Sequence, residues 1–549
     1  MRHDVTISQN LSLGGFVMKK WLEHYPEHIS KEITIPDMSL PDMLTKSASK
    51  FGNNTAIHFY GKETTYNELN NLVNAFTAAL QEEGIKKGDR VAIMLPNCPQ
   101  YVISYYGILQ TGGIVTQLNP MLVGKELEYI LNDSGAETIV IYEPLLPVLN
   151  KIMDNTSVKH VIKVNIEGRD ETDGVVIGFQ SFLKNANKSP VQVEFNPSED
   201  VAVLQYTGGT TGRSKGVMLT HRNLLANIMQ AFEFFKDAID MGKERFLSVI
   251  PLFHVYGMSS CMNLSIYTGA MNILLPRFDL EEVLETIKNI QPTSFPGVPT
   301  MYIALINHPK VNEYGLDSME ICNSGSAPMP VEILRSFEEK TGAKIVEGYG
   351  LSESSPTTHC NPLFATRKPG SVGIGVPSTD YKIVDLATGD NELYAGEVGE
   401  IIIKGPQVMK GYWNKPDETA QTLRDGWLYT GDIAYMDEDG YLYIVDRKKD
   451  LIIASGYNVY PRDVEEVLYE HPSIQEAVVV GVPDPYRGET VKAVVVLKEG
   501  STCTKDDLIF YCRENLSAYK VPRIIEFRKE LPKTGVGKIL RRKIREESS

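Results

Sequence analysis

The sequence has few cysteines and no long apolar run, and each absence excludes a class of protein. Six cysteines are scattered over 549 residues without a C-x-x-C pair, which speaks against a disulfide framework or a zinc ribbon and favours a reducing compartment. No stretch approaches about 18 uninterrupted apolar residues, so we expect no membrane-spanning helix, while peripheral membrane contact stays open. The polar N-terminus lacks a small-residue cleavage site, so we expect no signal peptide and a cytoplasmic location.

Basic residues are in the minority as well. The chain has 55 Lys and Arg against 70 Asp and Glu, a net charge of −15, whereas a dedicated nucleic-acid binder normally carries a basic surface. We therefore expect no nucleic-acid partner, although a local cluster of cations and backbone N–H groups still binds phosphate on an acidic protein. A hydrophobic fraction of 42% and a charged fraction of 23% are ordinary for a folded protein and exclude a disordered or collagen-like chain.

Strand-like and helix-like segments alternate through most of the chain. Residues 66–81 have helical apolar spacing, and residues 90–95, 138–142 and 200–206 are β-rich runs bounded by polar turns. Alternating units of this kind imply mostly parallel sheets covered by helices, that is, a multi-domain α/β protein. Between 372 and 436 short strands are punctuated by Gly and Pro, which predicts a small distorted β-barrel.

A charged run at 446–450 separates the last hundred residues from the rest. The sequence predicts a large N-terminal domain over 1–446, with an irregular lead-in at 1–35, and a small α+β domain over 447–549. Pro461 is typical of a first helical position, and Thr504 of a helix cap. Further strands are expected at 477–482, 491–497 and 524–527.

The most informative segment is residues 206–216, YTGGTTGRSKG. Its glycines let the backbone approach a ligand closely, and its hydroxyls and cations suit a polyphosphate. The segment is not a Walker A loop, because that motif ends in Gly-Lys-Ser/Thr and opens a helix. Here Lys215 precedes a glycine, residues 217–219 read as a strand, and a helix is expected only after Thr220. A strand–loop–strand hairpin is therefore predicted to bind the phosphates.

Four further motifs follow this loop in order. They are EGYGLSE at 347–353, YTGD at 429–432, DRKKD at 446–450 and PKTGVGK at 532–538. Together with the loop they resemble the acyl-adenylate-forming, AMP-binding superfamily, and residues 425–449 look like the signature of bacterial long-chain fatty acid–CoA ligases. The resemblance implies an enzyme that activates a long- or medium-chain fatty acid with ATP, releases pyrophosphate, and transfers the acyl group to CoA with release of AMP.

The resemblance also implies roles for individual residues. Thr207 and Glu353 match positions that hold Mg²⁺, and Lys538 matches the catalytic lysine that bridges carboxylate and α-phosphate. His254 matches a histidine near the carboxylate of the acyl group, with Met258 where some relatives have an aromatic gate. The remaining nucleotide- or CoA-binding matches are Gly208, Gly209, Thr210, Thr211, Gly212 and Lys215 in the loop, Gly325, Ser326, Ala327, Tyr349, Gly350 and Ser352 around the base and α-phosphate, Asp432, Ile444 and Arg447 at the ribose, and Asn458.

The second half-reaction requires a passage for the CoA thiol. By resemblance, the small domain swings about a hinge at Lys449, and Gly456 then leaves room for the pantetheine arm.

Several alternatives stay open at this stage. An aryl- or coumarate-type CoA ligase and a luciferase-like enzyme share the same motifs, and a stand-alone acyl-AMP ligase is a less favoured relative. A non-catalytic nucleotide or lipid binder is disfavoured, because it would be expected to lack Lys538, Glu353 or the loop, and all are present. The run at 253–271 is equally compatible with an acyl tunnel and with plain core. The chain length of the substrate is not predicted, and the enzyme is expected to be a monomer or a homodimer.

Overall fold

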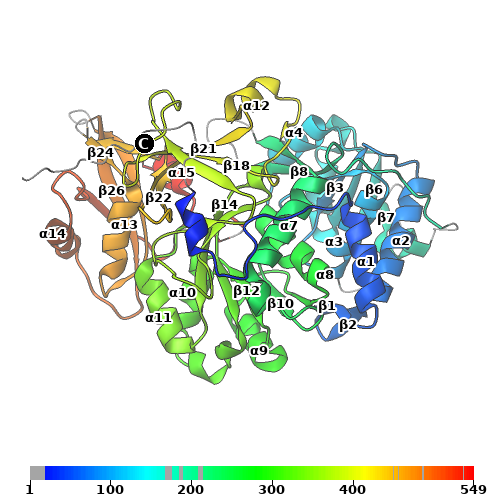
Figure 1. The fold of residues 1–549 in the computed structure, drawn as a ribbon, viewed down its shortest axis with the longest axis horizontal. Coiled ribbons are helices and arrows are strands. Elements are labelled where there is room, and N and C mark those ends of the chain that lie inside the picture. Colours follow the sequence, from blue (N-terminus) through cyan, green and yellow to red (C-terminus); the bar gives the residue numbers. More distant parts are fainter. Residues whose placement is uncertain are drawn as a thin grey trace, which may run out of the picture.

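The computed structural model describes residues 19–166, 176–184, 189–207, 214–448, 450–454, 457–484, 488–535 and 537–548. A large body occupies the centre and right of Figure 1, and a smaller unit from the C-terminal part of the chain lies at its left. No helix in these ranges is long and apolar enough to cross a bilayer.

The first sheet of the body confirms the expected βα pattern. Its strands are parallel except at one edge, where β8, β9 and β19 pair antiparallel. The strands lie in the order β19 (Gly411–Tyr412), β9 (Lys215–Thr220), β8 (Val201–Thr207), β4 (Ile114–Gln117), β3 (Arg90–Met94), β5 (Thr138–Tyr142), β6 (His160–Val164) and β7 (Val176–Gly178).

The second sheet is also parallel at its centre. Antiparallel pairs stand only at its two ends. Its order is β16 (Ile374–Gly375), β15 (Thr357–Cys360), β14 (Ile345–Gly350), β13 (Ile321–Ser324), β12 (Ser294–Gly297), β10 (Arg245–Ser248), β11 (Met271–Leu274), β1 (Thr55–Phe59) and β2 (Lys62–Thr65).

Helices join the two sheets through one apolar core. The helix α2 starts at Tyr66 because Thr65 and Glu68 form a capping box there. Val91 of the first sheet and Phe295 of the second belong to the same buried cluster. The helices of the body are α1 (Leu40–Phe51), α2 (Tyr66–Glu82), α3 (Pro99–Gln110), α4 (Gly124–Ser134), α5 (Leu146–Asn150), α6 (Phe179–Lys184), α7 (His221–Phe235), α8 (Leu264–Thr268), α9 (Leu280–Ile290), α10 (Pro299–Asn307), α11 (Val331–Thr341) and α12 (Pro416–Thr422).

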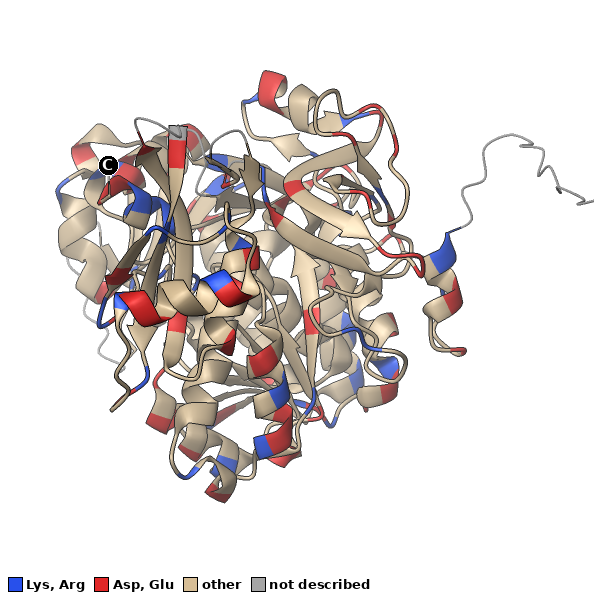
Figure 2. Cartoon of the chain, turned by 90° about the vertical axis from the view of Figure 1, so that its left-hand side faces the viewer, with Lys and Arg blue, Asp and Glu red and all other residues tan. Residues whose placement is uncertain are grey.

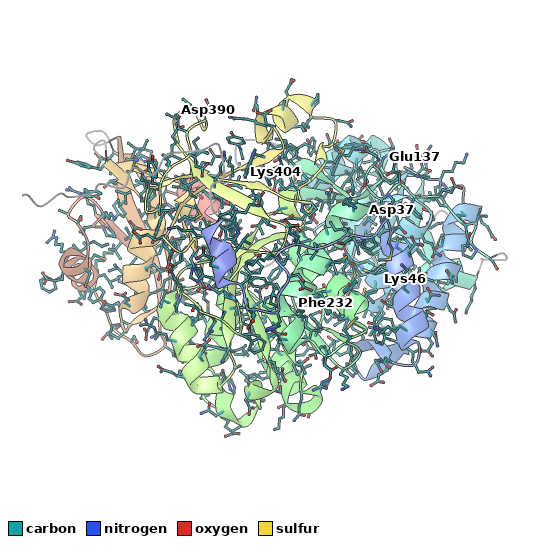
Figure 3. The ribbon with its side chains drawn as sticks, viewed as in Figure 1. Asp37, Lys46, Glu137, Phe232, Asp390 and Lys404 are labelled. Atoms are coloured by element: carbon teal, nitrogen blue, oxygen red, sulfur yellow. The ribbon has the colours of Figure 1, made fainter. Side chains whose placement is uncertain are left out.

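An antiparallel sheet stands where the small barrel was expected. Its pairing is β17-β18-β21-β20 with β22 on the other edge of β21, and no pairing between described residues joins the ends of this path into a closed barrel. The loop after β17 carries Asp390, at the upper edge of the molecule in Figure 3. The strands are β17 (Asp380–Val384), β18 (Gly399–Lys404), β20 (Leu423–Arg424), β21 (Trp427–Met436) and β22 (Leu442–Arg447).

The described part of the N-terminal lead-in, residues 19–35, contains a regular element that its sequence does not indicate. A short 3-10 helix, η1 (Lys20–His24), buries Trp21, whose ring lies 4.2 Å from that of Tyr381. This contact belongs to a second core cluster under the antiparallel sheet. Phe232 of α7 packs against both clusters and lies near the centre of the molecule in Figure 3. Sequence periodicity misses such a segment because its partners are hundreds of residues away.

The smaller unit has its own sheet and core. Thr504 caps α14 as predicted, and Pro461 is the first residue of α13. The long pair β25–β26 extends beyond the predicted strands, and β27 joins β26 in parallel. The elements are β23 (Ile452–Ala454), β24 (Tyr457–Val459), α13 (Pro461–Glu470), β25 (Ile474–Asp484), β26 (Gly488–Leu497), α14 (Lys505–Asn515), β27 (Ile524–Phe527) and α15 (Arg541–Glu546).

The cysteines fit the expectation of buried apolar residues. All six are free thiols, and five of them are buried, Cys503 being the exception. Burial raises the pKa of Cys98 and Cys261 to about 12, so these thiols are neutral and unreactive.

Candidate functional site

The segment 325–327 and the EGYGLSE motif meet where two neighbouring parallel strands end. Ser324, the last residue of β13, stands opposite Glu347 of β14, so the segment 325–327 and the end of β14 lie at the same edge of the sheet. Gly325 has its N–H bonded to the Gly297 carbonyl at 3.2 Å, and Ser326 adopts a positive φ of 66°. Ala327 follows Ser326 and is partly exposed.

Gly350 is the glycine of this site for which no other residue fits. A Cβ at this position would stand 2.1 Å from the Pro356 carbonyl oxygen, a backbone atom that has no freedom to move aside. The close approach places β14 and β15 side by side immediately before the 3-10 turn η8, Ser352–Ser354. Ser352 and Glu353 therefore follow Tyr349 around a tightly fixed corner.

Tyr349, Asp432 and Arg447 form one polar cluster from three strands. The Tyr349 hydroxyl donates to Asp432 Oδ2 at 2.6 Å, and Arg447 Nε lies 3.4 Å from Asp432 Oδ1. Asp432 on β21 and Arg447 on β22 are direct register partners. Burial, followed by the Asp432 charge, raises the pKa of the Tyr349 phenol well above its usual value. The Asp432 side chain is only 9% exposed. This one buried carboxylate joins the EGYGLSE motif, through Tyr349, to the YTGD motif.

The phosphate loop is described only at its two ends. Thr207 closes β8 and stands opposite Lys215 on β9, and Ser214 Oγ donates to the Thr207 carbonyl at 2.5 Å. The predicted strand–loop–strand hairpin is thereby confirmed, with α7 beginning only after the Thr220 cap. The expected phosphate contacts of Gly208, Gly209, Thr210, Thr211 and Gly212 lie outside the described residues.

Tyr412 connects Glu353 to this hairpin, and sequence reasoning did not identify it. Its hydroxyl donates to Glu353 Oε1 at 2.8 Å, and Lys215 Nζ lies 4.5 Å from the centre of its ring. Tyr412 belongs to β19, which pairs with β9 opposite Val217. A two-residue strand carries no periodic signal, so only the Gly-Tyr-Trp sequence at 411–413 marks it.

The oxygen atoms of Thr207 and Glu353 suit a hard cation such as Mg²⁺. A Mg²⁺ ion that serves a nucleotide is typically held by one or two carboxylates together with phosphate oxygens and water. Among the residues that the structure describes, no group of three or more His, Cys, Asp or Glu side chains forms a ready-made metal site. The donor set therefore fits a metal that arrives with a phosphate ligand.

His254 belongs to the body and Lys538 to the smaller unit, yet the Lys538 charge acts on the imidazole. His254 accepts a hydrogen bond at Nδ1 from the Tyr256 N–H at 3.2 Å. Burial, and then the charge of Lys538, lowers the pKa of His254 to about 4, so the imidazole is neutral at pH 7. The Lys538 hairpin touches the body where Thr300 Oγ1 donates to the Gly537 carbonyl at 3.2 Å.

Two further residues of the expected site, Ile444 and Asn458, have other partners. Ile444 lies on β22, where its carbonyl accepts from Arg462 at 2.6 Å. Asn458 is exposed on β24 of the smaller unit, and its side chain bonds to Tyr460. The expected contacts of Lys449 and Gly456 lie outside the described residues.

The run after His254 is deeply buried. Met258 is the second residue of a turn of π-helix, η5 (Gly257–Asn263), a feature that is frequent at functional sites. The Gln117 amide lies 3.1 Å from the Met258 sulfur, and both residues belong to the interior between the two sheets.

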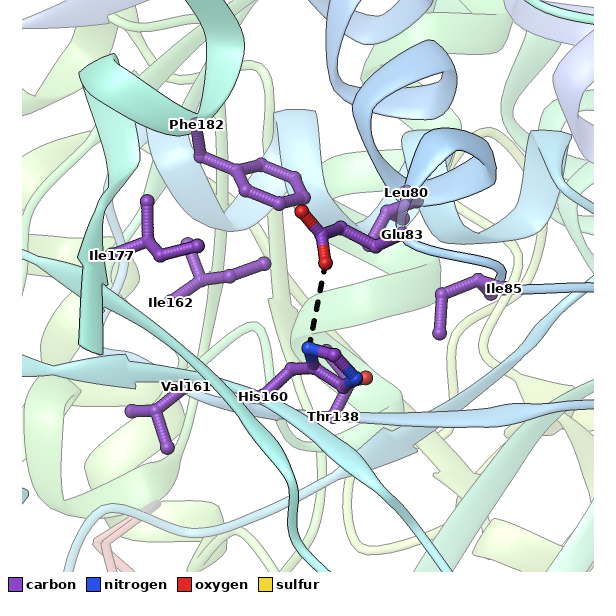
Figure 4. Close-up of a pocket in the computed structure, with 9 residues that line it drawn as sticks. All are labelled: Leu80, Glu83, Ile85, Thr138, His160, Val161, Ile162, Ile177 and Phe182. Carbon is purple, nitrogen blue, oxygen red and sulfur yellow. Dashed lines mark ion pairs between the residues drawn. The ribbon is translucent and has the colours of Figure 1, made fainter. Parts of the chain in front are cut away.

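A pocket elsewhere in the body is too small for a substrate. Figure 4 shows it beside the ion pair between His160 and Glu83, whose atoms Nδ1 and Oε2 are 3.5 Å apart. Thr138, the register partner of His160, and Phe182 also line it. Its interior holds about one water molecule, so we assign it no part in the site.

Charge is distributed evenly over the face of the smaller unit. Figure 2 views the molecule from that side and shows acidic and basic residues interspersed along the ribbon. The net charge of −15 is a sum over the whole chain, whereas Lys215 and Arg447 bring positive charge to the surroundings of Glu353 from distant parts of the sequence.

Comparison with known proteins covers nearly the whole chain. The AMP-binding enzyme family matches residues 44–413, and the AMP-binding enzyme C-terminal domain matches residues 463–538. The long-chain-fatty-acid–CoA ligase of Bacillus subtilis is 52% identical over 97% of this chain and 98% of its own, and that of Escherichia coli is 42% identical over 97% and 99%. The crystal structure of the anthranilate CoA ligase AuaEII with anthranoyl-AMP superimposes with a TM-score of 0.86 at 29% identity, covering 94% of this chain and 98% of that one.

Proposed function

The chain belongs to the AMP-binding enzyme family, and we propose that the site described above carries out the two half-reactions of a fatty acid–CoA ligase. The relatives that are 42% and 52% identical over nearly their full lengths are long-chain-fatty-acid–CoA ligases. ATP and CoA are accordingly the co-substrates.

In the first half-reaction a carboxylate oxygen of the fatty acid attacks the α-phosphorus of ATP, and pyrophosphate leaves. The adenine would stack on Tyr349, and the ribose hydroxyls would donate to Asp432, which Tyr349 and Arg447 already hold in place. The 206–216 loop and Lys215 would hold the β- and γ-phosphates. Lys538 would neutralise the charge that develops between the carboxylate and the α-phosphate, and the neutral His254 imidazole would line the carboxylate end of the acyl pocket.

We propose Mg²⁺ as the metal of this step, with Glu353 and Thr207 as its protein ligands. When bound, the ion would neutralise charge on the departing pyrophosphate. The hydrogen bond from Tyr412 to Glu353 at 2.8 Å fixes one carboxylate oxygen and orients the other.

In the second half-reaction the CoA sulfur attacks the acyl carbon, and AMP leaves with the bonding electrons. This step would need a different orientation of the smaller unit, because Lys538 is proposed to act at the acyl carboxylate in the first half-reaction and would have to leave before the thiol approaches. We propose that residues 447–549 turn about Lys449 and that Gly456 then leaves room for the pantetheine arm. The exposed position of Asn458 leaves it available to the adenylate after such a turn. The proposed boundary between residues 446 and 447 falls before the last residue of β22, Arg447.

The second candidate is an aryl-CoA ligase, because the structure with a TM-score of 0.86 is an anthranilate CoA ligase. The 52% identity to a long-chain-fatty-acid–CoA ligase favours the fatty acid. A luciferase-like oxidation would reveal itself by light emission.

A cytoplasmic location, a monomeric or homodimeric state and peripheral membrane contact are further proposals drawn from the sequence.

The observation that carries the proposal is the cluster of Tyr349, Asp432 and Arg447, together with the Thr300 bond to the Gly537 carbonyl that holds the Lys538 loop against the body. The decisive experiment measures CoA-dependent AMP formation with saturated acids of increasing length, and with benzoate and coumarate in parallel. We expect turnover with long or medium chains and little with the aromatic acids. Activity with aromatic acids alone would favour the second candidate, and no activity with any fatty acid would overturn the first.

A further inference from the structure

Buried charged groups outside the site described above cluster at the junction between body and smaller unit. Asp446, whose side chain is 1% exposed, ends β22 beside Arg447. One of its oxygens lies 3.4 Å from Arg541 Nη1, and the other accepts the Arg462 N–H at 3.2 Å. Arg541 also donates to Glu465 of α13 at 2.5 Å.

Arg541 is only three residues beyond Lys538, and a short hairpin links them rigidly. The Thr534 N–H donates to the Lys538 carbonyl at 2.7 Å, the Gly537 N–H to the Thr534 carbonyl at 2.8 Å, and the Leu540 N–H to the Pro532 carbonyl at 2.8 Å. Arg541 then begins α15. A displacement of Arg541 is therefore transmitted directly to Lys538.

Asp446 and Arg447 are adjacent in the sequence, and each forms an ion pair with a different partner. Arg447 pairs with Asp432 in the nucleotide cluster, while Asp446 pairs with Arg541 at the base of the Lys538 hairpin. The end of β22 thus ties the ribose-binding carboxylate and the catalytic lysine to one short stretch of backbone. Burial raises the pKa of Asp446 to about 6, and the Arg541 charge opposes that rise, so the pair is charged at pH 7.

We propose that Asp446 and Arg541 are positioning residues that clamp the Lys538 hairpin in the orientation for adenylate formation. The inference rests on the proposed function and extends it to two residues that were given no role from the motifs. The clamp has no task in the second half-reaction, since Lys538 must then leave the acyl group. Its loss should therefore slow one half-reaction and spare the other.

The test compares Arg541→Gln, Asp446→Asn and the double variant in both half-reactions. ATP–pyrophosphate exchange with a fatty acid reports the first, and thioester formation from a synthetic acyl-adenylate reports the second. We expect each single variant to lose tenfold or more in exchange and to stay within twofold in thioester formation. The double variant should be no worse than the poorer single one, because both changes break the same pair.

Arg528→Gln is the matched control. Arg528 makes two ion pairs inside the smaller unit, with Glu526 and Glu547, and its side chain is 21% exposed against 22% for Arg541. It does not touch β22 in the described structure, so both half-reactions should stay within twofold. A third variant, Arg541→Lys, retains the positive charge but lacks the forked guanidinium group that reaches both Asp446 and Glu465. It should recover part of the exchange rate.

Several outcomes would overturn the clamp. Equal losses in both half-reactions, an exchange rate like that of the unchanged enzyme, or a loss in Arg528→Gln as large as in Arg541→Gln would each do so. If Arg541→Gln fails to fold, Asp446→Asn and Arg541→Lys decide by the same comparison. Failure of the unchanged enzyme to activate any fatty acid would instead count against the proposed function, so the two failures are distinguishable.

Discussion

The Tyr349 hydroxyl donates a hydrogen bond of 2.6 Å to the Asp432 carboxylate across 83 residues of sequence. The bond joins the end of a strand in a parallel sheet to a strand of the antiparallel sheet, and so fixes the aromatic ring relative to the carboxylate. A ring assigned to adenine and a carboxylate assigned to ribose are therefore held at a set separation before the nucleotide arrives.

Removing that hydroxyl tests the relationship. Tyr349→Phe keeps the ring but releases Asp432, and a hydrogen bond to a charged group contributes about 1.5–3 kcal/mol. We expect the KM for ATP to rise roughly tenfold with a smaller change in kcat. Tyr443→Phe is the control, because its hydroxyl reaches Asp437 only at 3.4 Å outside the site. An unchanged KM in Tyr349→Phe would show that the bond has no part in nucleotide binding.

Lys538→Ala separates the two half-reactions. The lysine is proposed to act on the charge that forms at the α-phosphate, so its loss should abolish ATP–pyrophosphate exchange. Thioester formation from supplied acyl-adenylate should continue near the normal rate. A similar loss in both steps would contradict the assigned role.

Gly350→Ala should disrupt the corner that leads to Glu353. The added methyl would stand 2.1 Å from the Pro356 carbonyl oxygen, and forced overpacking of this kind costs roughly 2 kcal/mol. We expect a lower thermal midpoint together with loss of adenylate formation. Gly124→Ala serves as the control, because its methyl would meet nothing closer than 3.4 Å at the start of α4. Equal stability of the two variants would contradict the steric argument.

Acid should destabilise the protein through its buried histidines. His221 accepts at Nδ1 from the Leu40 N–H at 3.3 Å, and burial lowers its pKa to about 4 from 6.5. The unfolded chain binds a proton below pH 6.5 while the folded chain does not, so stability is lost as pH falls from 6.5 toward 4. The contribution of this one group between pH 7.5 and 5 is about 2 kcal/mol.

Urea unfolding of His221→Asn at these two pH values measures that contribution. The amide oxygen replaces Nδ1 as acceptor without titrating, so the difference in unfolding free energy between pH 7.5 and 5 should shrink by about 2 kcal/mol. His359, whose pKa burial lowers to about 3, supplies a remaining slope of the same sign in both proteins. An unaltered difference in His221→Asn would mean that His221 carries its proton in the folded state.

Local patterns predicted the regular elements well. The helix expected after Thr220 begins at His221, and the strands expected at 138–142 and 524–527 agree with the structure residue by residue, because apolar periodicity and capping chemistry act over a few neighbouring residues. The strands at 477–482 and 491–497 proved longer, since pairing with each other extends them past their apolar centres. The burial of Trp21 was missed because its partner Tyr381 is remote in sequence.

The sequence by itself determined the family and the order of its motifs, since those depend on residue type and short spacing. Only the tertiary structure decided which side chains touch. The Tyr412 contact to Glu353, the Thr300 contact to Gly537 and the Asp446–Arg541 pair all depend on strand pairing and on how the smaller unit packs against the body. Such contacts join residues that are 59 and 95 apart in the chain, and no local pattern records them because the energy that forms them comes from burial of the whole core.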